Sequence, residues 1–182
     1  MKTNFDDIVE KLRSGELERQ IGGIDDAKEV IAELVRKATD LLFNPLVEGS
    51  RYVVAERLFT MGPVVIADLE GRVEMSKNVV GEGNTYAALI LLRLGSSKGV
   101  ALLLEALRNG IGPTGMIAQS LGAAGIQAAG EVICQALARL PFDRDPYTAA
   151  SMISALHDLR APVPAAMLDE LETIAPHVRR LL

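Results

Sequence analysis

The stretch from Asn84 to Asn109, NTYAALILLRLGSSKGVALLLEALRN, most constrains what this chain can fold into. Two short segments flank Gly95, and in each the apolar residues recur at the spacing of one helix face. Both segments are too apolar to be soluble as isolated helices, so the stretch predicts a helical hairpin that needs further helices against it. The two stripes consist of Ala87, Ala88, Leu91, Leu92, Val100, Leu103, Leu104 and Leu107.

The polar and glycine residues of this stretch predict where its helices begin and end. Asn84 is expected to cap the first helix, and Ser96 or Ser97 the second, because a side-chain oxygen can accept from an early backbone N–H. Gly95 is expected to leave the first helix with positive φ. Asn109-Gly110 should end the second helix.

Related pairs precede and follow this hairpin. Leu94-Gly95 recurs as Leu121-Gly122, and in weaker form as Met61-Gly62 and Leu159-Arg160, each followed by an apolar helical stripe. The spacings are uneven, roughly 27 to 38 residues, but they fall within the range of about 20–50 residues that is typical of helical repeat proteins.

The pattern AALILLRLG…GVALLLEALRNG resembles the HEAT-like repeats of bacterial proteins, including those of phycobilisome lyases. The resemblance is clearest from Asn84 to Leu140. It implies an all-α chain, a right-handed α-solenoid of about four helical hairpins in residues 46–182 behind an N-terminal helical cap in residues 1–45, the whole forming one continuous domain. Such repeats occur in scaffolds, adaptors, lyases and nucleic-acid enzymes, so the resemblance bears on fold more than on function.

The N-terminal segment predicts two helices. Ser14-Gly15 should end the first, and Gly22-Gly23 reads as a short connector. The most periodic helix should then begin at Asp25 or Asp26 and end at Asn44-Pro45. Its inward stripe is expected to be Ala27, Val30, Ile31, Leu34, Val35, Ala38, Leu41 and Leu42.

Further boundaries are marked by proline and glycine. A helix is expected over residues 46–60, with Gly62-Pro63 opening the next and Ser76 to Gly83 forming a polar loop. Asp145-Pro146 should cap and begin another helix, and Pro176 should break the last one.

Composition narrows the range of partners and compartments. The formal net charge of −5 disfavours a general nucleic-acid binder and suits a protein partner with a basic surface. Cys134, the single cysteine, falls in an apolar stripe and is expected to be a buried structural thiol. The start lacks a secretory apolar run and no long apolar stretch is present, so we expect no membrane span and a cytoplasmic protein.

Catalytic and metal-binding patterns are poorly represented. The stretch from Gly81 to Thr85 leads into a helix but lacks the lysine of a phosphate-binding loop. His157 and His177 have no partner at metal-ligand spacing, and the carboxylate pairs sit where helix caps and polar faces explain them. We therefore expect no cofactor, no metal and no catalytic residue.

What remains is a surface on the second helix of each hairpin. The plainest interpretation of its polar residues is a solvated face; the functional one is a mixed, mainly acidic strip that binds another protein. The chain would then be a non-catalytic adaptor or an inhibitor of the immunity-protein type. The alternative is a lyase or chaperone-like enzyme of the phycobilisome-lyase kind that holds a cofactor in the groove. The predicted protein-binding residues are Glu70, Glu105, Arg108, Gln135, Arg139, Asp169 and Glu172.

Overall fold

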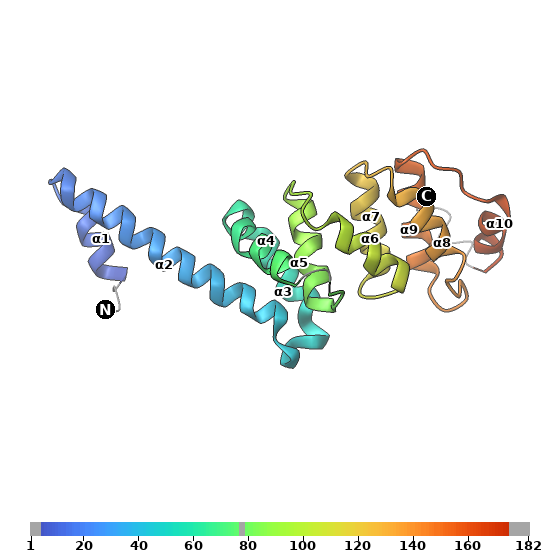
Figure 1. Cartoon of the computed structure of the whole chain (residues 1–182), viewed down its shortest axis with the longest axis horizontal. Coiled ribbons are helices and arrows are strands. Elements are labelled where there is room, and N and C mark those ends of the chain that lie inside the picture. The colour runs from blue at the N-terminus through green and yellow to red at the C-terminus, as the bar shows by residue number, and fades with distance from the viewer. Residues whose placement is uncertain (1–4, 77–78, 175–182) are drawn as a thin grey trace.

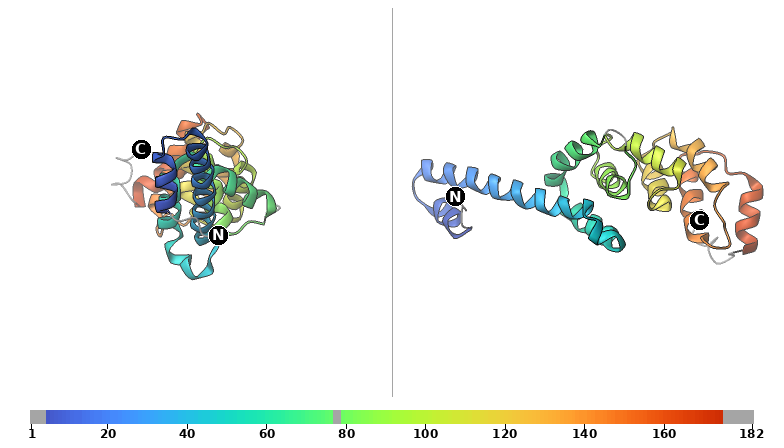
Figure 2. Two further views of the ribbon diagram at one scale, coloured as in Figure 1. Left: turned by 90° about the vertical axis from the view of Figure 1, so that its left-hand side faces the viewer. Right: turned by 60° about the horizontal axis from the view of Figure 1, so that its bottom comes forward.

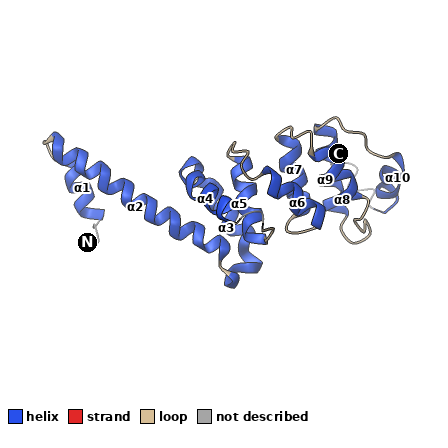
Figure 3. Ribbon diagram, in the orientation of Figure 1, coloured by secondary structure: helices blue, strands red, loops and turns tan. Residues whose placement is uncertain are grey.

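A computed structural model describes residues 5–76 and 79–174. Within these ranges every regular element is helical, with ten α-helices, two short 3-10 helices and no strand (Figure 3). The expectation of an all-α chain is confirmed. The elements are α1 (Phe5–Arg13), α2 (Leu17–Phe43), η1 (Pro45–Ser50), α3 (Arg51–Thr60), η2 (Gly62–Val65), α4 (Ile66–Met75), α5 (Glu82–Arg93), α6 (Val100–Asn109), α7 (Thr114–Ala123), α8 (Ala129–Leu137), α9 (Pro146–Asp158) and α10 (Ala165–Ile174).

The helices follow one another along an elongated molecule (Figure 1). The hairpin of α1 and α2 projects from one end, and we call it the arm; the right-hand view in Figure 2 shows the same projection. From α3 onward, which we call the body, alternate helices pack on one another: α3 on α5, α5 on α7, and α7 on α9. The intervening helices α6 and α8 also touch each other.

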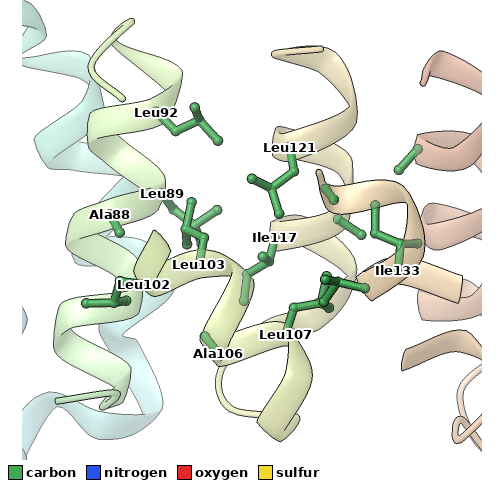
Figure 4. Packing of buried hydrophobic residues seen from close by; sticks show 14 of the residues in the cluster. Ala88, Leu89, Leu92, Leu102, Leu103, Ala106, Leu107, Ile117, Leu121 and Ile133 are labelled. Atoms are coloured by element: carbon green, nitrogen blue, oxygen red, sulfur yellow. The ribbon is translucent and has the colours of Figure 1, made fainter. Parts of the chain in front are cut away.

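One continuous aliphatic core runs through the body. It extends from Val35 in α2 to Leu159 after α9. Figure 4 shows side chains of α5, α6, α7 and α8 meeting in this core. Leu103 and Leu107 are fully buried as the periodicity predicts, whereas Leu104 is only half-buried at the edge.

Several predicted boundaries are confirmed. Gly95 and Gly110 adopt positive φ, of 90° and 66°, at the ends of α5 and α6. The Asp145 side chain caps α9 by accepting from the Thr148 backbone N–H at 3.1 Å. The helix expected over residues 46–60 is divided, because residues 45–50 form a 3-10 helix before α3 begins. Pro176 lies outside the described residues.

Neither predicted cap of the central hairpin forms. Helix α5 begins at Glu82, so Asn84 lies inside its first turn and donates from Nδ2 to the Val79 carbonyl at 2.9 Å. No serine side chain caps α6, whose N-cap residue is Gly99. A Cβ on Gly99 would lie 2.6 Å from that of Ala88, so close contact with α5, rather than side-chain capping, fixes this turn.

The predicted connector at Gly22-Gly23 is also wrong, because α2 runs unbroken from Leu17 to Phe43. A glycine inside a helix costs about 1 kcal/mol relative to alanine, yet it permits close approach of a neighbour. Gly23 is buried beneath α1, where a Cβ would lie 3.0 Å from the Cβ of Lys11. Packing of α1 on Gly23 therefore keeps the helix continuous.

Small residues bring α7 and α9 together, and this contact generates a prediction. A Cβ on Gly122 would lie 2.8 Å from the Cα of Ala155. We expect Gly122→Ala to destabilise the protein, because overpacking costs about 1–3 kcal/mol and alanine's helix propensity returns at most about 1 kcal/mol. Denaturant unfolding measures the change.

The matched control is Gly71→Ala. Gly71 is also inside a helix, but apart from its chain neighbours and the backbone of its own helix, no atom of the described residues lies within 4 Å of the position of its missing Cβ. Alanine there should stabilise by up to about 1 kcal/mol. Equal effects of the two substitutions would contradict the tight packing of α7 on α9.

Candidate functional site

Four of the seven predicted binding residues lie on two neighbouring helices. Glu105 and Arg108 belong to α6, whereas Gln135 belongs to α8 and Arg139 follows it. The Glu105 carboxylate accepts from Arg108 at 3.2 Å and from Asn109 at 2.8 Å. These hydrogen bonds, that from Asn109 first, lower the pKa of Glu105. Arg139 donates from Nε to the Gln135 carbonyl at 3.1 Å.

A hollow of about 280 Å³ opens beside these residues, between the ends of α6 and α8 and the helices α7 and α9. Its floor is apolar, and its rim carries the amide of Asn109 and the guanidinium of Arg139. We call it the α6–α9 hollow. It is lined by Leu107, Asn109, Gly110, Thr114, Ala136, Arg139, Leu140 and Met152.

Glu70, another residue of the predicted strip, bonds to two other side chains of the same chain. Its carboxylate accepts from the Ser96 hydroxyl at 2.7 Å and pairs with Lys98 at 3.0 Å. These two interactions, the Ser96 hydrogen bond first, lower the pKa of Glu70. Glu70 therefore links α4 to the turn between α5 and α6, a structural task that its position in the sequence did not reveal.

Asp169 and Glu172 lie on α10 at the far end of the body. Both are exposed, and α10 packs against α9. Of the seven predicted residues, Arg139 lines the hollow. Glu105, Arg108 and Gln135 lie on α6 and α8, whose ends border it, and the other three predicted residues lie on other helices.

A second hollow, of about 440 Å³, lies among α3, α5 and α7 and was missed from the sequence. Arg93 on its wall lies over the Phe59 ring, 3.9 Å from the centroid, and pairs with Glu56. In the sequence Arg93 only interrupts an apolar run. A charged residue directly after the six apolar residues from Ala87 to Leu92 was the available signal.

Cys134 and His157 carry no evident site. Cys134 is half-buried rather than buried; its Sγ lies 3.6 Å from the Pro162 carbonyl, and burial raises the pKa of the thiol. His157 is exposed on α9, and His177 lies outside the described residues. Over the ranges 5–76 and 79–174, no group of His, Cys, Asp and Glu is arranged to hold a metal ion.

None of the described helices is long and apolar enough to cross a membrane. Comparisons with family models, with curated proteins and with solved structures found no match for the chain. The interpretation of the surface therefore depends on its geometry.

The two carboxylates Glu70 and Glu105 generate a paired prediction. Glu70→Gln should lower the melting temperature more than Glu105→Gln, because Glu70 joins two parts of the fold and Glu105 bonds only within its own helix. Thermal unfolding at pH 7 measures both.

The pH dependence follows from the lowered pKa of Glu70. Its stabilisation is present above the pKa of an unfolded glutamate and is lost as the pH falls through the lower folded value. The gap between wild type and Glu70→Gln should therefore close under acidic conditions. A gap that widens as the pH falls would show that Glu70 is not held as an ionised partner.

Proposed function

We propose that this chain is a non-catalytic protein-binding module whose α6–α9 hollow receives an anchoring side chain of its partner. The observation that carries the proposal is the apolar floor of the hollow beneath a polar rim of Asn109 and Arg139. Binding energy at protein interfaces concentrates where a side chain fills such a pocket and polar groups around it exclude water. At about 280 Å³ the hollow lies just below the usual range of small-molecule sites, about 300–1,000 Å³.

The charges on the helices beside the hollow support recognition rather than folding. Within the described part of the chain, Glu105, Arg108 and Arg139 are bonded only within their own helices or to the adjoining turn. Exposed pairs of this kind contribute little to stability, about 0.2–0.5 kcal/mol. They do set the electrostatic field that an approaching partner meets. The net charge of −5 favours a partner with a basic surface.

The arrangement of the helices as a stack of repeats is part of the same proposal. Packing of α3 on α5, α5 on α7 and α7 on α9, with α6 on α8, is the order of contacts that a stack of HEAT-like hairpins would have. A right-handed solenoid behind an N-terminal cap is our proposed architecture. Its role would be that of a cytoplasmic adaptor or of an inhibitor of the immunity-protein type.

The proposal is tested with a photo-crosslinking amino acid placed at Asn109 on the rim. The matched control places the same amino acid at Arg57, an exposed residue of α3. We expect a discrete protein cross-link in host cells from position 109, absent from position 57 and weakened by Arg139→Glu. Indistinguishable cross-links at both positions, or none at position 109, would overturn the assignment of the hollow.

A kinetic prediction follows for the captured partner. Glu105→Lys should slow association with a basic partner, because opposite charges raise the rate of encounter. Added salt should narrow the difference from wild type, since exposed charges are screened over about 8–10 Å at ordinary ionic strength. Surface plasmon resonance at two salt concentrations measures this effect.

The control for that measurement is Glu29→Lys, which makes the same charge change on the exposed surface of α2. It should leave the association rate close to that of wild type. If neither Glu105→Lys nor added salt changes the association rate, the binding surface lies elsewhere on the molecule.

A further inference from the structure

The arm exposes a row of large apolar side chains that the chain does not cover. The sequence predicts an inward stripe along this helix, but only part of that stripe meets the body. Six large apolar side chains along α2 remain between 47% and 70% exposed. Ile21 is one of them, and the five that form the row are Leu17, Ile24, Ile31, Leu34 and Leu41.

These residues follow a seven-residue repeat. Leu17, Ile24 and Ile31 are seven apart, and a second series of Ala27, Leu34 and Leu41 begins ten residues after Leu17 with the same spacing. Two such series, offset by three residues within the heptad, form the seam of a coiled coil. The helix has 27 residues, which gives it a length of about 40 Å.

Other residues of α2 hold the arm on the rest of the chain. Near the tip Gly23 packs under α1, and near the body Val35 and Leu42 are buried. Arg72 of α4 also pairs with Asp40 at 2.6 Å and with Asp68 at 2.7 Å, and Asp68 accepts from the Thr39 hydroxyl. These bonds fix α2 on the body while leaving the seam open.

We infer that the seam is covered by α2 of a second copy of this chain, running antiparallel. The positions of the seam lie symmetrically about Glu29, with the small Ala27 opposite Ile31, so the helix can pair with a second copy of itself, as a two-fold interface requires. In that register each layer pairs a member of one series with a member of the other. The layers are Leu17 with Leu41 of the second copy, Ile24 with Leu34, and Ala27 with Ile31.

The exposed area suits such a pairing. Half-exposed side chains of this size offer roughly several hundred Å² per copy, a large part of the about 800 Å² that each partner contributes to a standard interface. Two arms side by side place four helices around one core, the usual way for helical hairpins to bury their apolar faces.

Charges beside the seam do not oppose the pairing. Lys28 pairs with Asp25 at 3.2 Å, and Lys37 pairs with Glu33 at 2.7 Å, each within one turn of α2. The cations next to the apolar row thus carry their own counterions. The arm dimer also leaves the α6–α9 hollow of each copy uncovered, so this inference is independent of the proposed function.

Sedimentation equilibrium of the full chain tests the dimer. We expect a dimer that dissociates on dilution, and we expect Leu34→Glu to weaken it at least about tenfold while the helical circular dichroism is retained. Ala32→Glu adds the same charge at an exposed position of α2 outside the seam and should leave the dimer intact. A wild-type chain that is monomeric at about 100 μM, or a dimer indifferent to Leu34→Glu, would overturn the inference.

Cysteine cross-linking tests the direction of the helices. In a Cys134→Ser background, Ile24→Cys and Leu34→Cys are prepared as separate proteins and then mixed under mild oxidation. The antiparallel register predicts a disulfide-linked dimer in the mixture and little in either protein alone. Efficient linking of each variant to itself would indicate a parallel pair and overturn the register.

Discussion

Close contact between aliphatic helices is the interaction on which this structure depends. Small residues permit it: Gly99 lies against Ala88, and Gly122 lies against Ala155, at distances that no larger side chain would allow. Leucine and isoleucine side chains such as Leu103 and Ile117 then become fully buried between neighbouring helices. Each contributes about 1.5–3 kcal/mol, and because no helix can bury its own stripe, each depends on the next. The elongated shape follows from this serial dependence.

Charged residues are consequently confined to the edges of these layers, where they do two different things. Some join separate helices, as Arg72 joins α4 to α2 and Arg51 joins α3 to Glu82 of α5. Others, such as Arg108 and Glu105, bond only within one helix and add little to stability. This contrast separates residues that the fold requires from residues available to a partner. It is the reason for assigning the partner surface to α6 and α8 and not to Glu70.

The sequence could predict elements whose causes are local, and it failed where packing between helices decided the outcome. Gly95, Gly110 and the cap at Asp145 act through backbone conformation or a nearby side chain, and all three were predicted correctly. Asn84 and Gly22-Gly23 obey the same local rules, but contacts between helices override them. At the candidate site, too, local features were predictable from the sequence and features that depend on packing were not. Periodicity put Glu105 and Arg139 on polar faces, yet only the packing of α6 on α8 shows that a hollow lies between their helices.

The arm shows why an apolar stripe in a sequence need not be an inward stripe. The periodic residues of α2 predicted one buried face, whereas the structure divides them between the body, α1 and solvent. An isolated helix is only marginally stable in water and gains its stability from packing, so the uncovered seam weakens the part of the chain farthest from the core. Pairing of two arms would remove that deficit and make the stability of the arm depend on concentration. It would also place two α6–α9 hollows on one particle, so a partner with repeated anchors would be held by both, and avidity would exceed the affinity of either hollow.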